Sequence, residues 1–252
     1  MRALLWDVDG TLAETERDGH LVAFNCAFQS LRMPWRWSEQ RYGELLAVAG
    51  GYERLLHDMA LRQEAPAAAR QRARLARALH LHKNRIYERI VRRGDLPLRA
   101  GVRELLADCL AARLPMAIVT TTGRANVAAL LERHLGVQWH SRFAAVACAE
   151  LAPAKKPDPQ AYLVALNALR LSAQDVVAIE DSPAGLEAAR RAGVPVLLTR
   201  SRFFRDCSAA GALAAGPSLA SCAGWYPRAE PHAARITLAQ IERWHAQRAC
   251  AR

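Results

Sequence analysis

Long apolar runs are missing from this chain of 252 residues. None reaches the roughly 20 residues that a transmembrane helix needs, so we expect no association with a membrane. The short apolar start, residues 1–6, leads directly into a candidate active site and leaves no room for a signal peptide. We therefore expect a cytoplasmic protein.

Cysteine is also scarce, and no two cysteines are spaced as metal ligands. The six are scattered, at Cys26, Cys109, Cys148, Cys207, Cys222 and Cys250. This pattern predicts free buried thiols and argues against a disulfide framework or a zinc site.

Acidic residues are outnumbered, with 24 Asp and Glu against 35 Lys and Arg and a formal net charge of +11. The imbalance is concentrated in residues 70–93, where Glu88 is the only acid. A solvated basic helix face is our first interpretation, and steering of a phosphorylated substrate is the second. Nucleic-acid binding is the third, because no known reader motif accompanies the charge.

Apolar segments of strand length alternate with helical patterns along the chain. Strands are expected at residues 3–6, 116–119, 143–148, 176–179 and 194–198, with helices at 126–135, 158–169, 183–192 and 236–249. This alternation predicts an α/β fold with a parallel sheet covered on both faces. Residues 208–224 read as a loop.

A wholly helical block interrupts the alternation directly after the first strand. We predict that residues 14–95 form an inserted helical domain and that residues 1–13 and 96–252 form the sheet-containing core. A chain of this length suits one core with a smaller companion domain.

Polar residues follow four of the predicted strands. They are Asp7 and Asp9, Thr120 to Thr122, Lys155 and Lys156, and Glu180 and Asp181. Ligands bind at the carboxyl ends of strands in open parallel sheets, so we expect these groups to converge on one rim.

The first group, Asp7-Val8-Asp9-Gly10-Thr11, places two carboxylates on the same side of an extended chain. They would repel each other, and a divalent cation resolves that conflict. Two carboxylates also allow one to act as nucleophile and the other as general acid and base. A surface turn is the plain alternative, whereas an EF-hand is excluded because no glutamate closes the loop.

The other three groups suit a phosphate and a metal. Thr120 and Thr121 offer hydroxyls and N–H groups, Lys156 offers a cation, and Glu180 and Asp181 offer further carboxylates. Taken singly, these could reflect strand propensity, a solvated loop lysine and helix capping. Four such groups in this order are hard to obtain by chance.

On these residues the chain resembles the haloacid dehalogenase (HAD) superfamily, over about residues 1–200. Within it the chain is similar to CbbY-like phosphatases, which carry a helical cap after the first motif. The supporting residues are Ala13 to Glu16, His20, Ala23 to Asn25, Ala49 to Gly51, Glu53, Arg54, Lys83 and Tyr87. The resemblance implies a Rossmann-like core with an α-helical cap.

The resemblance also implies roles. Asp7 would attack phosphorus, and Asp9 would protonate the leaving group and then activate water. Mg²⁺ would be held by Asp7, the backbone carbonyl of Asp9, and Asp181, with Glu180 nearby. Thr120, Thr121 and Lys156 would bind the transferring phosphoryl group.

The cap would select the substrate. The resemblance implies xylulose-1,5-bisphosphate, a Rubisco inhibitor removed in support of the Calvin cycle. Arg54 and Lys83 would bind its second phosphate, unless they are only surface charges. The sugar hydroxyls would meet Glu16, His20, Tyr42, Gly50 and Gly51.

Two rival functions remain at this point. A phosphomutase of the β-phosphoglucomutase kind shares the motifs, the cap and a threonine matched by Thr15. A basic nucleic-acid-binding protein without catalysis is the second rival. A true dehalogenase is disfavoured, because it needs neither a metal nor a second aspartate. We expect a monomer that acts on a small phosphorylated sugar with Mg²⁺ and binds no nucleic acid.

Overall fold

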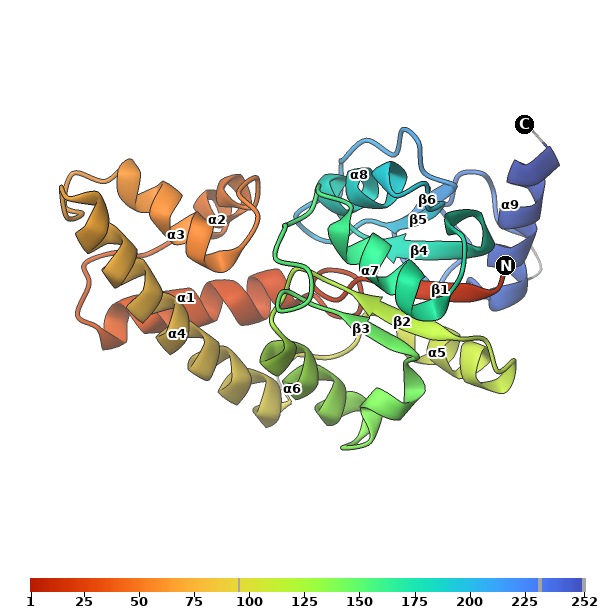
Figure 1. Cartoon of the computed structure of the whole chain (residues 1–252), viewed down its shortest axis with the longest axis horizontal. Coiled ribbons are helices and arrows are strands. Elements are labelled where there is room, and N and C mark those ends of the chain that lie inside the picture. Colours follow the sequence, from red (N-terminus) through yellow and green to blue (C-terminus); the bar gives the residue numbers. More distant parts are fainter. Residues whose placement is uncertain (95, 231–232, 251–252) are drawn as a thin grey trace.

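Six strands form one parallel sheet in the order β3-β2-β1-β4-β5-β6 (Figure 1). The computed structural model of the chain describes residues 1–94, 96–230 and 233–250. The strands are β1 (Ala3–Trp6), β2 (Met116–Val119), β3 (Ala145–Ala147), β4 (Val176–Glu180), β5 (Val196–Thr199) and β6 (Ala214–Gly216). Their near-continuous apolar runs are typical of strands buried on both faces. The predicted α/β fold with a Rossmann-like core is confirmed.

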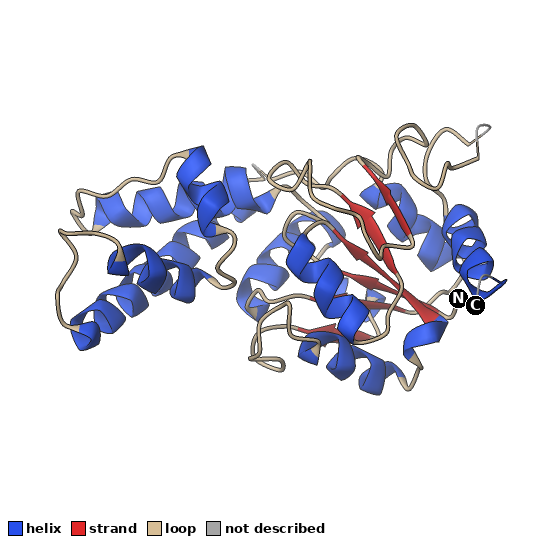
Figure 2. Ribbon diagram, turned by 90° about the horizontal axis from the view of Figure 1, so that it is seen from above, coloured by secondary structure: helices blue, strands red, loops and turns tan. Residues whose placement is uncertain are grey.

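Helices cover both faces of the sheet (Figure 2). They are α5 (Val102–Ala111), α6 (Arg124–Leu135), α7 (Gln160–Leu169), α8 (Pro183–Arg191) and α9 (Leu238–Cys250), with short turns η2 (Trp139–Arg142) and η3 (Ala173–Asp175). Successive strand side chains point to opposite faces. Leu5 therefore belongs to the core cluster that contains Tyr162 and Leu186 of α7 and α8, whereas Leu4 belongs to the cluster that contains Leu105 and Leu130 of α5 and α6.

A lobe of helices lies beside the carboxyl ends of the strands (Figure 1). It contains a π-helical turn η1 (Glu16–Leu21) and helices α1 (Val22–Ser30), α2 (Glu39–Leu45), α3 (Gly51–Ala60) and α4 (Ala69–Arg93). Aromatic rings fill its centre, with the Trp37 ring 4.7 Å from that of Phe24 and 5.0 Å from that of Phe28. The predicted boundary of this block at residue 95 lies outside the described residues.

The two chain crossings between lobe and sheet lie side by side. Ala13 and Leu98 form an antiparallel bridge, and the Arg99 N–H donates to the Leu12 carbonyl at 2.8 Å. The Arg99 guanidinium also donates to the carbonyls of Thr199 and Arg200 after β5, each at 2.7 Å. The crossings are thereby fixed to the carboxyl end of β5.

One prediction is wrong, because residues 208–224 are not all loop. Ala214–Gly216 forms β6, which pairs with β5 along the edge of the sheet. Three small residues are too short for a readable apolar alternation and have low strand propensity. They form a strand because they pair with β5.

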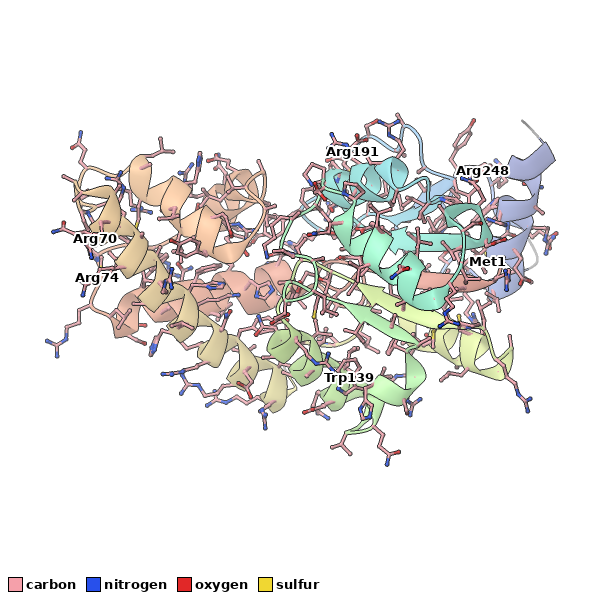
Figure 3. All side chains as sticks on the ribbon, in the orientation of Figure 1. Met1, Arg70, Arg74, Trp139, Arg191 and Arg248 are labelled. Atoms are coloured by element: carbon pink, nitrogen blue, oxygen red, sulfur yellow. The ribbon has the colours of Figure 1, made fainter. Side chains whose placement is uncertain are left out.

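The basic residues of α4 lie mainly on its outer side, and Arg70 and Arg74 project away from the lobe (Figure 3). These charges are therefore carried by a solvated helix face, as our first interpretation held. Within the described part of the chain, no helix combines the length and the apolar character needed to cross a membrane.

Candidate active site

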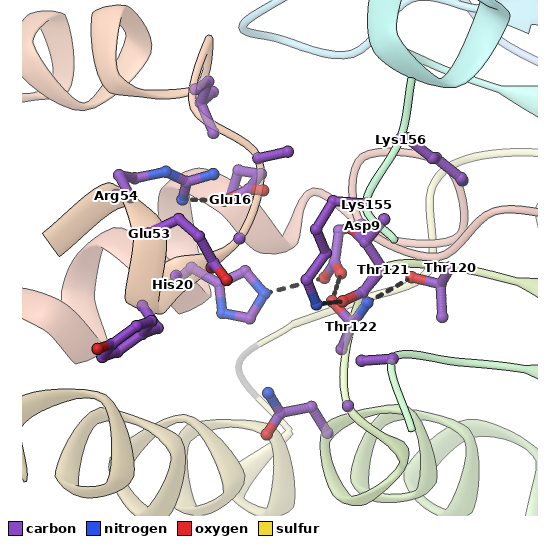
Figure 4. Close-up of a pocket in the computed structure, with 18 of the residues that line it drawn as sticks. Asp9, Glu16, His20, Glu53, Arg54, Thr120, Thr121, Thr122, Lys155 and Lys156 are labelled. Carbon is purple, nitrogen blue, oxygen red and sulfur yellow. Dashed lines mark hydrogen bonds and ion pairs between the residues drawn. The ribbon is translucent and has the colours of Figure 1, made fainter. Parts of the chain in front are cut away.

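The four polar groups converge on one cavity of about 390 Å³ between the sheet and the lobe. Figure 4 shows three of these groups at the cavity, through Asp9, Thr120 to Thr122, Lys155 and Lys156. Asp7 follows β1, Thr120 follows β2, Lys156 lies in the loop after β3, and Asp181 follows β4. Parallel pairing of Trp6 with both Ile118 and Ile179 aligns these strand ends. The predicted convergence on one rim is present.

A cluster of three buried carboxylates lies at the base of the site. Asp7, Glu180 and Asp181 each offer an oxygen, and these atoms lie within 4.8 Å of one another. Lys156 Nζ bridges two of them, at 2.7 Å from Asp7 Oδ1 and 2.6 Å from Glu180 Oε1. A third contact, to the Val119 carbonyl at 2.9 Å, holds the lysine at the end of β2.

The cluster has more negative charge than this lysine neutralises. Burial raises the pKa of Asp7 to about 7, although Lys156 opposes that shift. Burial and the charge of Asp7 likewise raise the pKa of Asp181 well above its ordinary value. Among the described residues, Asp7 Oδ2 and Glu180 Oε2 are buried without a hydrogen-bond partner. Oxygen atoms with these properties fit a hard divalent cation.

Gly10 keeps the turn after the first strand open for this cluster. Its φ of +86° lies in the left-handed region, which favours glycine. A Cβ at this position would overlap the Asp181 carboxylate. The first motif and the fourth motif are therefore in direct contact.

Asp9 is surrounded by three hydrogen-bonding groups. Its Oδ1 accepts from Thr15 Oγ1 at 2.5 Å and lies 3.0 Å from His20 Nε2, and its Oδ2 accepts from Thr122 Oγ1. Burial alone would raise the pKa of Asp9, but His20 and the two threonines outweigh it and lower that pKa. Asp9 is ionised in this arrangement. Its partners come from the entrance to the lobe and from the loop after β2.

The predicted phosphate-binding groups lie next to Asp7 and Asp9. Thr120 is buried, and its Oγ1 accepts from the Thr122 N–H at 3.1 Å. Thr121 lines the cavity, and its carbonyl accepts from Lys155 Nζ at 3.1 Å. Burial opposes the charge on Lys156, but Asp7 and Glu180 raise the pKa of that lysine. Lys156 is thus a buried cation and not a solvated loop lysine.

Six of the seven predicted substrate residues line the cavity, namely Glu16, His20, Gly50, Gly51, Arg54 and Lys83. Arg54 and Lys83 are 6% and 4% exposed, so the alternative of surface charge is wrong for both. Lys83 Nζ lies 5.0 Å from the centre of the Phe24 ring and 5.2 Å from that of Tyr87. Among the described residues, no carboxylate forms an ion pair with this lysine.

Tyr42 occupies a different position from the other six. It is fully buried and is absent from the cavity lining. Its hydroxyl donates to Glu16 Oε2 at 2.5 Å and accepts from Arg54 Nη1 at 2.7 Å. Tyr42 therefore holds two residues that line the cavity and does not itself face it.

Several lining residues were missed by the sequence reasoning. His80 and Asn84 share one face of α4 with Lys83, so helical spacing from that lysine could have identified them. Phe204, beyond the last motif, also lines the cavity. No pattern in the sequence indicates its position.

Three comparisons relate this geometry to known proteins. The model of the haloacid dehalogenase-like hydrolase family matches residues 1–193. Protein CbbY of Cupriavidus necator is 44% identical over 247 residues, which cover 97% of each chain. A crystal structure of a CbbY variant from Rhodobacter sphaeroides in complex with xylulose-(1,5)-bisphosphate has a TM-score of 0.83 at 30% identity and covers 96% of this chain and 99% of its own.

A more distant structure shares the fold alone. β-Phosphoglucomutase from Clostridium difficile has a TM-score of 0.73 at 18% identity and covers 99% of each chain. At that identity the similarity says nothing of the reaction.

Proposed function

This chain belongs to the haloacid dehalogenase-like hydrolases and, within them, to the CbbY proteins, and we propose that its substrate is xylulose-1,5-bisphosphate. The predicted family is thus confirmed, and the chain is an enzyme, a sugar-phosphate phosphatase. The named substrate, the metal and the roles of single side chains are our proposal. In the cell, such an enzyme would remove an inhibitor of Rubisco in support of the Calvin cycle.

One observation carries the proposal. Three carboxylates and one lysine, from three separate strand ends, meet at the base of a cavity whose opposite wall carries two further buried cations. A phosphate ester needs a nucleophile and positive charge around the transferring phosphoryl group. A bisphosphate needs a second anion site as well.

We propose Mg²⁺ as the cation of the carboxylate cluster. Asp7, the backbone carbonyl of Asp9, and Asp181 would hold it, with Glu180 nearby. The unpartnered oxygens of Asp7 and Glu180 support this assignment, because a buried ionised oxygen without a partner is costly. When bound, Mg²⁺ would supply positive charge against the phosphoryl oxygens and help to orient them.

Asp7 is the proposed nucleophile. One of its carboxylate oxygens would form a bond to phosphorus while the bond from phosphorus to the sugar oxygen breaks, giving an aspartyl-phosphate. Lys156 contacts the Asp7 carboxylate and would neutralise charge that develops on the phosphoryl group. Thr120 and Thr121 would donate hydrogen bonds to the same group.

Asp9 is the proposed general acid and base. It would give a proton to the departing sugar oxygen and later take one from the water that attacks the aspartyl-phosphate. In the arrangement described here it is ionised, since Thr15, His20 and Thr122 favour its charged form. The negative charge of a bound substrate would raise its pKa and weaken those contacts, so that it can carry the proton.

The lobe would bind the end of the substrate away from the reaction. Arg54 and Lys83 are the proposed partners of the second phosphate, because both are buried cations at the cavity wall. Glu16, His20, Gly50 and Gly51 would contact the sugar hydroxyls. Tyr42, which we expected to contact the sugar, is now proposed to orient Glu16 and Arg54.

The organisation of the enzyme completes the proposal. Residues 14–95 would act as a cap that closes over the substrate and excludes water, on a core of residues 1–13 and 96–252. We also propose that the enzyme is a cytoplasmic monomer. Light scattering after size-exclusion chromatography tests the oligomeric state.

The decisive test is a phosphate-release screen over sugar mono- and bisphosphates, with and without Mg²⁺. We expect release from xylulose-1,5-bisphosphate that needs Mg²⁺. Asp7→Asn should lower turnover by more than about a thousandfold. The variant should still fold, because Lys156 keeps its buried ion pair with Glu180. Wild-type turnover retained by Asp7→Asn would refute the mechanism.

Two further assays, for mutase turnover and for oligonucleotide binding, separate the rivals. A phosphomutase would convert β-glucose-1-phosphate and release little phosphate from the bisphosphate. A nucleic-acid-binding protein would bind oligonucleotides in a salt-sensitive way and would be unaffected by Asp7→Asn.

A further inference from the structure

A short segment after β5 connects the core to both the lobe and the cavity. It consists of Arg202, Phe203 and Phe204, which lie beyond the four motifs. Arg202 forms an ion pair with the lobe, Phe203 packs on a lobe helix, and Phe204 lines the cavity. These three consecutive residues thus connect the core to the lobe and reach the cavity wall.

The lobe presents one face of α2 to this segment. Glu39, Tyr42 and Gly43 are spaced three and four residues apart and therefore share that face. Arg202 Nε lies 2.7 Å from Glu39 Oε1, and the Phe203 ring centre lies 5.8 Å from that of Tyr42 in an edge-on arrangement. All three α2 residues therefore face Arg202 or Phe203.

Gly43 is explained by the same contact. It lies inside α2, where glycine is less favourable than alanine. A Cβ at this position would come within 3.2 Å of Phe203 Cδ1, which is closer than side chains usually approach. The helix therefore has a glycine where the aromatic ring presses on it.

Tyr42 transmits this contact to the cavity. Its ring meets Phe203 on one side, and its hydroxyl bonds to Glu16 and Arg54 on the other. The Arg54 guanidinium also lies 5.0 Å from the centre of the Tyr42 ring. A change at Phe203 would move Tyr42 and, with it, the buried cation that faces the substrate.

We propose that Phe203 is a positioning residue that selects for substrates with a second anionic group, by fixing Tyr42 and through it Arg54. This inference rests on the proposed function, since Arg54 is there assigned to the second phosphate. Phe203 does not touch the reacting atoms. Its effect is therefore on binding of the distal end of the substrate and not on the chemistry at Asp7.

The test compares kcat/KM for xylulose-1,5-bisphosphate with kcat/KM for phenyl phosphate, which has no second phosphate. In Phe203→Ala we expect the ratio of the two to fall about tenfold, which corresponds to a weakened charged hydrogen bond. The loss should lie in KM for the bisphosphate and not in kcat. Phe203→Tyr, which keeps the ring, should restore the ratio.

Arg191→Gln is the matched control for surface effects. Arg191 forms a 2.7 Å ion pair with Glu187, similar in length and exposure to that of Arg202 with Glu39, but lies on α8. The control should keep the wild-type ratio, whereas Arg202→Gln should lower it. An unchanged ratio in Phe203→Ala, or an equal loss on both substrates, would overturn the proposal.

Gly43→Ala decides the matter if Phe203→Ala does not fold. Alanine favours the helix, so the melting temperature should not fall, while its methyl group presses on the Phe203 ring. We expect a lower ratio in this variant too, and a wild-type ratio would overturn the proposal. A wild-type enzyme that hydrolyses phenyl phosphate but not the bisphosphate would instead refute the proposed substrate, and this inference with it.

Discussion

Replacing Lys156 by methionine should destabilise the metal-free enzyme strongly. The lysine is 6% exposed and bridges Asp7 and Glu180 at 2.7 and 2.6 Å. Methionine keeps most of the volume and removes the charge. Asp7 and Glu180 would then be buried together without a cation, at the same place as Asp181.

The size of the effect follows from the cost of breaking a buried ion pair. Removing one partner of such a pair costs about 3–5 kcal/mol of unfolding free energy. For a chain of this size, that corresponds to a fall in melting temperature of about 6–20 °C.

The effect should depend on pH with a defined sign. Burial raises the folded-state pKa of Asp7 from 3.8 to about 7, and Lys156 opposes that rise. Without Lys156 the pKa of Asp7 would be higher still. A carboxyl whose pKa is higher in the folded state than in the unfolded state lowers the stability of the protein as the pH rises from 3.8 to the folded-state pKa. The defect should therefore be largest at pH 8 and smaller at pH 5.5.

Thermal unfolding followed by circular dichroism in EDTA is the assay, and Lys155→Met is the matched control. Lys155 is the neighbouring lysine and also lines the cavity. Among the described residues its ammonium forms one hydrogen bond, to the Thr121 carbonyl at 3.1 Å, and no ion pair. Its loss should cost about 1 kcal/mol or less. Equal melting temperatures for the two variants at pH 8 would refute the buried bridge.

Two further predictions concern the lobe and the first motif. Burial lowers the pKa of Lys83 to about 8, so its positive charge is lost as the pH rises through that value. KM for the bisphosphate should then rise about tenfold between pH 7 and pH 9, and steady-state kinetics of Lys83→Met should show no such rise. Gly10→Ala would force a Cβ into the Asp181 carboxylate at a φ of +86°. Mg²⁺ titration by calorimetry should show binding weakened by about tenfold or more, and wild-type affinity in this variant would contradict the contact.

The core half of the site could be predicted from the sequence because its geometry follows from strand ends. Asp7, Thr120 and Asp181 each come within one or two residues of a short apolar strand, and a parallel sheet brings such positions together. The position of Lys156 was harder to predict, since it lies in a loop several residues beyond β3. The clustering of Asp7, Glu180 and Asp181 within 4.8 Å agrees with the expectation.

For the lobe half of the site, the sequence could identify the residues but not their arrangement. The burial of Arg54 and Lys83 depends on how α3 and α4 pack in the lobe. This packing cannot be predicted from the sequence of either helix alone. The position of Tyr42 behind Glu16 and the contacts of Asp9 also arise from segments far apart in the chain. Phe204 lies in the loop after β5, beyond the last motif, and only the tertiary fold brings it to the cavity.

The distribution of charge supports our proposal that the substrate is a bisphosphate and not a monophosphate. At the core wall, carboxylates exceed cations, which supports the proposal that a metal binds there before a phosphoryl group. At the lobe wall, Arg54 is only partly balanced by Glu16, which lies 3.7 Å away, and Lys83 forms no ion pair among the described residues. Unbalanced buried cations are costly unless an anion reaches them. A substrate with a phosphate at each end would satisfy both walls at once, whereas a monophosphate would bring no second anion to the lobe cations.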